Sequence, residues 1–268
     1  MPLELYSFHV ARGVVLVVRQ RESAGGNVVI NNKIISILKE GQNIAILPHV
    51  SPDGDALGSS LAFGLVLKSM GKSVDVILEE DVPEVYSFLP GMALARMYTD
   101  IETEYDVALV LDTGDVERIG KRIKFFEGAR ATVNIDHHIT NTMFADYNLV
   151  QTGASAVGEI VYQFVRMMGF TPSVDVATCL YVAITTDTGG FRYSNTTPVT
   201  HQVAADLINC GIEVAEISNA VFESTSWEKV RMLGEAISTL EGHLDGKLAV
   251  MTIRDEMLKR VCAKDEDC

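Results

Sequence analysis

The chain has 268 residues, 47% of them hydrophobic, and a formal net charge of −14. This hydrophobic fraction is ample for a packed core and argues against general disorder, while the acidity argues against a broad basic surface for nucleic acid. A short or small anionic substrate stays compatible with the charge, because bound divalent cations would invert it locally.

Residues 1–28 are expected to be an extension outside the core fold that ends in the flexible Ser23-Ala24-Gly25-Gly26. The apolar segment 10–18 is short and is interrupted by Arg12, so a membrane anchor there is the less favoured interpretation. The four cysteines form no CxxC pair. Cys179 and Cys210 lie within apolar helical patterns and are expected to be core thiols. A reducing compartment fits this pattern, and we expect a cytoplasmic protein.

From residue 31 onward, strand patterns alternate with helix patterns. We predict strands over residues 43–47, 73–78, 106–111 and 131–135, the last two being the near-continuous apolar runs of parallel strands buried on both faces. Helices are predicted over residues 32–40, 56–70, 154–168, 174–185 and 198–209. This alternation implies an α/β fold with a mostly parallel sheet flanked by helices.

The character of the sequence changes near Ser226. A helix over residues 227–237, a hairpin over 240–253 around its Asp-Gly pair and a helix over 255–261 are predicted. A hairpin with so few helices is too small for an independent core. We therefore expect a first domain over residues 29–225, followed over 226–268 by a connecting helix and the first elements of a truncated second domain.

The first candidate site segment is the loop HVSPDGDALGS, which follows a strand and opens a helix. His49, Asp53 and Asp55 would project from it at the carboxyl edge of the sheet, where open α/β sheets bind ligands. Gly58 and Ser59 would let the backbone approach a ligand at the helix start. The alternative is a solvated turn in which an Asp caps the helix.

Three further segments carry acidic or imidazole side chains. Asp112 follows a buried strand, and a carboxylate at such a position is either a helix cap or a ligand. Asp136, His137 and His138 follow another strand, and neighbouring strand residues point to opposite sides. One imidazole would then bind a metal while the other faces substrate or packs. Asp187, in TTDTGGF, follows an apolar helix as a ligand or a turn residue.

Four carboxylates, those of Asp53, Asp55, Asp112 and Asp187, and up to three imidazoles would thus converge from four segments. Without cations the carboxylates would repel one another and their pKa values would rise. Two divalent ions remove that repulsion and form the clamp used for in-line displacement at phosphorus. Mixed histidine and carboxylate ligation suits manganese, iron, cobalt or zinc. The expected chemistry is phosphoester hydrolysis.

The segments HVSPDGDALGS, VLDTGD, IDHH and TTDTGGF, in this order and spacing, resemble the motifs of the DHH phosphoesterase family. That family includes RecJ-like exonucleases, nano-RNases that also dephosphorylate 3′-phosphoadenosine 5′-phosphate, exopolyphosphatases and manganese pyrophosphatases. The resemblance runs from about Asn31 to the chain end. PDGDALGS, GASAVGE and FRYSNTTP favour the nano-RNase branch over the pyrophosphatases.

The resemblance implies two divalent cations, manganese ahead of magnesium or cobalt, with a carboxylate bridging them. The implied ligands are His49, Asp53 and Asp112 for one cation, and Asp55, Asp112, His137 and Asp187 for the other. The resemblance further implies that His138 contacts the phosphate and that Asp136 orients an imidazole. Ser59, Ser155 and Arg192 are further candidate substrate contacts.

The implied activity is hydrolysis of short oligoribonucleotides, as an exoribonuclease, or of 3′-phosphoadenosine 5′-phosphate, by attack of a metal-bound hydroxide. The resemblance is compatible with a homodimer and with no membrane partner. A cyclic-dinucleotide phosphodiesterase, an exopolyphosphatase and a non-catalytic nucleotide-binding module are the alternatives. Family members hold the nucleotide partly through a Gly- and His-rich motif of a second domain, which this chain lacks before Cys268. We expect metal binding without it and leave activity on oligonucleotides open.

Overall fold

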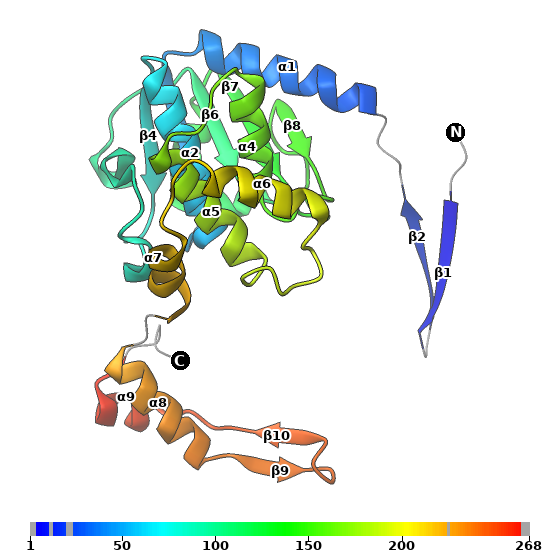
Figure 1. Cartoon of the computed structure of the whole chain (residues 1–268), viewed down its shortest axis with the longest axis vertical. Helices are drawn as coiled ribbons and strands as arrows, with labels where there is room; N and C mark the ends of the chain where they lie inside the picture. Colours follow the sequence, from blue (N-terminus) through cyan, green and yellow to red (C-terminus); the bar gives the residue numbers. More distant parts are fainter. Residues whose placement is uncertain (1–3, 11–12, 20–23, 224–225, 264–268) are drawn as a thin grey trace. The chain divides into compact units, whose positions relative to one another are not determined.

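The computed structural model describes residues 4–10, 13–19, 24–223 and 226–263 (Figure 1). The chain divides into two compact units, residues 1–214 and 215–268. The boundary predicted at residues 225–226 lies within the second unit. None of the helices in the described ranges has the length and apolarity that crossing a bilayer requires.

A six-stranded sheet forms the centre of the first unit, and its strands run in the order β5-β4-β3-β6-β7-β8. All neighbouring pairs are parallel, which confirms the predicted α/β fold. The strands are β3 (Asn43–Leu47), β4 (Ser73–Leu78), β5 (Ala95–Met97), β6 (Val107–Leu111), β7 (Ala131–Asp136) and β8 (Tyr147–Val150). Every residue of β6 is buried, as expected for a strand covered on both faces.

Helices cover the sheet, and α2, α4 and α5 pack against one another (Figure 1). The helices of this unit are α1 (Ala24–Glu40), α2 (Gly54–Ser69), α3 (Ile123–Glu127), α4 (Val157–Met167), α5 (Val174–Asp187) and α6 (Pro198–Ile208). On β3, the side chain of Ile46 reaches α2 near Gly64, whereas Leu47 packs in a cluster with Phe125 and Phe126 of α3. The core therefore lies on both faces of the sheet.

The strand order reverses between β3 and β6. From β3 the chain adds β4 and β5 on one side, then returns to add β6, β7 and β8 on the other. At such a reversal the connections leave in opposite directions, and a crevice opens at the carboxyl ends of the strands. His49 follows β3 and Asp112 follows β6, so the topology places these two residues on either side of the reversal.

The second unit contains a hairpin with helices before and after it. Its elements are α7 (Val214–Ser218), which begins at the unit boundary, the π-helical segment η5 (Asn219–Glu223), α8 (Trp227–Ser238), β9 (Glu241–His243), β10 (Leu248–Val250) and α9 (Asp255–Val261). The hairpin turn uses positive φ angles at Leu244, Asp245 and Gly246, which confirms the hairpin predicted from its Asp-Gly pair. A small buried cluster joins α8 to α9 and contains Met232, Met257 and Val261.

The start of the chain differs from the prediction. β1 (Glu4–Val10) and β2 (Gly13–Arg19) pair as antiparallel strands. Helix α1 begins at Ala24, so the boundary predicted at residue 28 falls inside it, while Ser23 lies outside the described residues. Gly25 and Gly26 each disfavour a helix by about 1 kcal/mol relative to alanine. The other residues of this 17-residue helix outweigh that cost. Strands β5 and β8 were not predicted, because three or four residues show no clear period.

Gly58 lies where α2 meets α5. A Cβ atom added to it would lie 2.5 Å from the carbonyl oxygen of Cys179 and 3.2 Å from the Cβ of Ala183. The interpretation that Gly58 admits a ligand is therefore replaced by one in which its size lets two helices approach.

We expect Gly58→Ala to lower the free energy of unfolding by about 1–3 kcal/mol, because the added methyl group meets backbone that cannot move aside. Gly64→Ala in the same helix is the control, since its Cβ would meet the end of a side chain, Leu94 Cδ1, at 3.0 Å and not the backbone. Urea unfolding of both variants measures the difference. Equal stability of the two would contradict the close approach of α2 to α5.

Candidate metal centre

Side chains of the types that bind metals meet at the carboxyl edge of the sheet in three overlapping groups. Within each group the ligand atoms lie within 4.8 Å of one another. The groups are His49, Asp53 and Asp112; Asp55, His137 and Asp187; and Asp112, His137 and His138. Asp112 belongs to two groups and His137 to two, so the structure brings all of the predicted ligands into one cluster.

Asp53 serves both of the roles that its sequence context allowed. It is the N-cap of α2, and its Oδ1 accepts a hydrogen bond from the backbone N–H of Ala56 at 3.0 Å. Its Oδ2 lies 3.7 Å from Nε2 of His49. Capping therefore orients this carboxylate toward the site while using only one of its oxygens.

Asp55 is held rigidly at the junction of two helices. Its carboxylate accepts hydrogen bonds from the backbone N–H groups of Val157 and Gly158, at 2.6 and 2.9 Å, and from the Ser59 hydroxyl at 2.9 Å. The first two donors come from the start of α4, where an anion is stabilised. Burial nevertheless raises the pKa of Asp55 to about 7, and the nearby Asp187 charge adds to the rise.

Asp112 is the least satisfied group in the cluster. Its residue is 3% exposed, its backbone adopts a φ of +54°, and its Oδ1 is buried without a hydrogen-bond partner. Burial raises its pKa well above the ordinary value, and the charges of Asp55 and Asp53 raise it further. A strained backbone that holds an unpartnered buried carboxylate is costly and is typical of a functional site.

The distances within the cluster fit cations shared between side chains. Nε2 of His49 lies 3.7 Å from Asp53 Oδ2 and 3.8 Å from Asp112 Oδ2, and Nε2 of His137 lies 3.6 Å from both Asp112 Oδ1 and Asp187 Oδ2. These separations are too long for hydrogen bonds. Two ligands at about 2.1 Å from one ion lie at most about 4.2 Å apart, so the residues present fit divalent cations.

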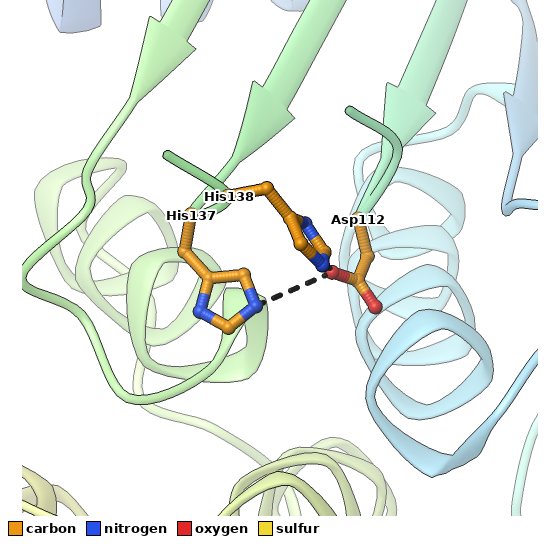
Figure 2. Close-up of side chains that lie close together, drawn as sticks. All are labelled: Asp112, His137 and His138. Atoms are coloured by element: carbon orange, nitrogen blue, oxygen red, sulfur yellow. Dashed lines mark ion pairs between the residues drawn. The ribbon is translucent and has the colours of Figure 1, made fainter. Parts of the chain in front are cut away.

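His137 and His138 turn toward the same carboxylate (Figure 2). Nε2 of His137 and Nδ1 of His138 each lie 3.6 Å from Asp112 Oδ1, and the two ring centroids are 4.7 Å apart. The expectation that the imidazoles point to opposite sides is wrong. The strand ends at Asp136, so its alternation of side chains does not extend to these residues.

Asp136 orients His138. It is fully buried, with Oδ1 2.7 Å from Nδ1 of His138 and with Oδ2 accepting a hydrogen bond from Asn141 Nδ2 at 2.6 Å. Although burial acts to raise the pKa of Asp136, these two bonds hold it below the ordinary value. The same bond raises the pKa of His138. Because Nδ1 donates to Asp136, Nε2 of His138 remains available at the site.

Sequence reasoning missed Asn134 and Asn141. The Asn141 amide donates to Asn134 Oδ1 at 2.8 Å, and Asn134 Nδ2 donates to the carbonyl oxygen of Thr113 at 3.1 Å. These bonds join the end of β7 to the loop after β6. The available signal was Asn134 itself, a polar residue within an otherwise apolar strand that proves fully buried.

The three further candidate substrate contacts, Ser59, Ser155 and Arg192, all make hydrogen bonds within the protein. Ser59 and Ser155 are fully buried, and their hydroxyls donate to Asp55 and Glu159, both at 2.9 Å. Both hydroxyls are thus committed within the protein. Arg192 is exposed, and its Nε donates to the carbonyl oxygen of Gly189 at 2.6 Å.

Comparison with known proteins finds relatives that match most of this chain. The chain is 32% identical over 218 residues to the bifunctional oligoribonuclease and PAP phosphatase NrnA of Thermus thermophilus, a match that covers 80% of this chain and 64% of that protein. It is 27% identical over 233 residues to the Bacillus subtilis protein of the same name, covering 85% and 72%. The chain thus spans less than two thirds of the length of the Thermus relative.

A solved structure has the same fold. The exopolyphosphatase-related protein from Bacteroides fragilis superposes with a TM-score of 0.84 at 26% identity, covering 90% of this chain and 74% of that one. The family model described as the DHH family N-terminal domain matches residues 43–184, which contain every residue of the cluster except Asp187. Because that match spans more than half of the chain, the chain belongs to the DHH family.

Proposed function

We propose that this chain is a metal-dependent phosphoesterase of the nano-RNase branch, acting on short oligoribonucleotides and on 3′-phosphoadenosine 5′-phosphate. The observation that carries the proposal is Asp112. It is a buried carboxylate with an unpartnered oxygen, and its two oxygens face imidazoles from two different segments. The names of the Thermus and Bacillus relatives support the choice of substrates.

Two cations would divide the cluster, and we propose manganese for both. His49, Asp53 and Asp112 would hold one, and Asp55, Asp112, His137 and Asp187 the other. When bound, such cations neutralise the phosphoryl oxygens and lower the pKa of water at the site. Carboxylate together with imidazole ligation suits manganese better than magnesium, which prefers oxygen ligands.

The protein's own groups would orient the substrate and bear charge. In the doubly protonated ring of His138, which the Asp136 bond favours by raising the pKa of this imidazole, Nε2 would carry an N–H that donates to a phosphate oxygen as charge develops in the transition state. Asp136 keeps the other ring nitrogen protonated and fixes the plane of the ring. Asp55 and Asp112 are positioned by backbone and burial, so little reorganisation is needed when cations and substrate arrive.

Asn141 positions His138 through Asp136, so we expect Asn141→Ala to lower kcat by about 10- to 100-fold with little change in bound manganese. Asn148→Ala is the control. Asn148 bonds the backbone of Ala145 in the same connection but does not reach Asp136. Steady-state kinetics and metal analysis of both variants measure the effect. An Asn141 variant with wild-type kcat would contradict the positioning role.

The proposed function is tested by incubating the chain with manganese and a substrate panel. The panel holds RNAs of two to five nucleotides, 3′-phosphoadenosine 5′-phosphate, a cyclic dinucleotide and inorganic polyphosphate. Release of nucleoside monophosphates or of phosphate from the first two substrates, lost on chelation and restored by manganese, is the expected result. Turnover of the last two alone would reassign the substrate, and chelator-resistant turnover would exclude the proposed site.

A further inference from the structure

Arg118 brings a positive charge to the acidic cluster, where its side-chain contact is with an imidazole. It lies in the 3₁₀ segment η4 (Val116–Arg122), which follows β6, and its side chain is exposed. Its Nη2 atom lies 3.0 Å from Nδ1 of His49. Among the described residues no ion pair involves this guanidinium, and its hydrogen-bond contact is to an imidazole.

The backbone keeps Arg118 at this position. Its carbonyl oxygen accepts a hydrogen bond from the N–H of Val50 at 2.9 Å and another from the buried Arg122 at 3.4 Å. The residue after His49 is therefore bonded directly to Arg118. Because the main chain is fixed, the guanidinium moves only by rotating its side chain, and it stays within reach of the His49 side of the cluster.

The contact with His49 is incompatible with a His49 that binds a cation. Nδ1 of His49 also lies 2.7 Å from the carbonyl oxygen of Val50. A carbonyl only accepts and a guanidinium only donates, so Nδ1 satisfies one of them at a time. With Nε2 bound to a cation, Nδ1 carries the proton and donates to Val50. The guanidinium of Arg118 would then face another donor and would turn away.

The balance of charges at the site indicates that the released guanidinium of Arg118 could bind a substrate phosphate. The four proposed ligand carboxylates would balance two divalent cations, which leaves the cluster without excess positive charge, and the whole chain carries −14. A phosphate arriving with one or two negative charges needs further donors.

We propose that Arg118 binds a phosphate oxygen of the substrate beside His49 and is set free for this role when His49 takes up its cation. The inference rests on the proposed function. It makes Arg118 a substrate-binding residue whose partner changes from an imidazole to a phosphate. The guanidinium offers two parallel N–H donors, which match two oxygens of one phosphate.

The test compares wild type with Arg118→Gln, Arg118→Lys and Arg130→Gln in the full chain. Arg130→Gln is the matched control, because it removes the same charge from an exposed residue at the opposite edge of the sheet, where it pairs with Asp106 at 3.3 Å. Calorimetry first measures the Kd of manganese alone, then the Kd of inorganic phosphate for the manganese-loaded protein. KM and kcat on 3′-phosphoadenosine 5′-phosphate follow.

We expect Arg118→Gln to bind manganese within twofold of wild type and to bind phosphate about 10- to 100-fold more weakly, the range for a lost charge-assisted hydrogen bond. The phosphate affinity of Arg118→Lys should lie between those of wild type and Arg118→Gln, because lysine keeps the charge without the paired donors. Arg130→Gln should match wild type.

Wild-type phosphate affinity in Arg118→Gln would overturn the inference. So would a large loss of manganese affinity in that variant, since Arg118 would then support His49 itself. Phosphate binding is measured apart from hydrolysis. If the wild-type chain binds phosphate through Arg118 but turns over no substrate, the proposed function is contradicted while the inference about Arg118 stands.

Discussion

Asp112→Asn is expected to lower kcat by about 10³-fold or more and to remove at least one manganese ion per chain. The substitution keeps the size of the side chain but removes the charge that would join both cations. In the cluster, Asp112 alone combines near-complete burial with an oxygen that lacks a hydrogen-bond partner, so no neighbouring side chain is in place to substitute for it. Metal analysis after dialysis and single-turnover kinetics measure the two effects.

The control for this variant lies at the other end of the same strand. Asp106 precedes β6, and its Oδ2 accepts hydrogen bonds from the backbone N–H groups of Gln42 and Asn43 at 2.9 and 3.0 Å. Asp106→Asn should lower stability while leaving bound manganese and turnover unchanged. In the metal-free state Asp112→Asn should instead raise the melting temperature at neutral pH, because burial opposes ionisation of the Asp112 carboxyl group and the amide carries no ionisable proton. Wild-type turnover in Asp112→Asn would rule out the bridging role.

Manganese is expected to raise the melting temperature by about 5–10 °C for each bound cation, and by more at pH 8 than at pH 6. A ligand at 100 times its Kd contributes about 2.7 kcal/mol, which corresponds to this shift in a domain of this size. Differential scanning calorimetry with chelator or with manganese, at both pH values, measures it.

The pH dependence follows from the raised pKa values of Asp55, about 7, and of Asp112. A carboxyl group whose pKa is higher in the folded than in the unfolded state stabilises the fold when protonated. That contribution is complete below the unfolded pKa and is lost as the pH rises through about 7. Metal-free protein should therefore weaken from pH 6 to pH 8, while cations, which require ionised ligands, bind more tightly. An equal manganese shift at both pH values would contradict this coupling.

Local patterns were enough to predict much of the fold. The run that became β6 is apolar throughout, and the run that became β7 combines apolar residues with Thr132 and Asn134. The spans that became α2, α5 and α6 carry long apolar patterns closed by glycine or followed by a turn. Short elements escaped prediction, because a strand of three or four residues has no measurable period. Helix α1 shows the reverse case, in which a long helix absorbs two glycines that alone would have indicated a linker.

At the site, residue type and position at strand ends were sufficient to choose the candidate ligands. His49, Asp112 and His137 each follow a strand of the same parallel sheet, and the carboxyl ends of such strands share one edge. Contacts that depend on the third dimension were not predictable. Asn141 reaches Asp136 through a loop whose path the sequence does not reveal, and Arg118 meets His49 only because η4 folds back across the reversal.

The sequence alone therefore determined the α/β class, the family and the chemical types at the candidate centre, because these depend on local periodicity and on motifs whose spacing is linear. The tertiary structure alone decided which groups are buried, which of them lack partners and which side chains share a carboxylate. Asp136, His137 and His138 illustrate the division. Their types were readable as ligands, but burial and the end of β7 decided that both imidazoles face Asp112 and that Asp136 holds one of them.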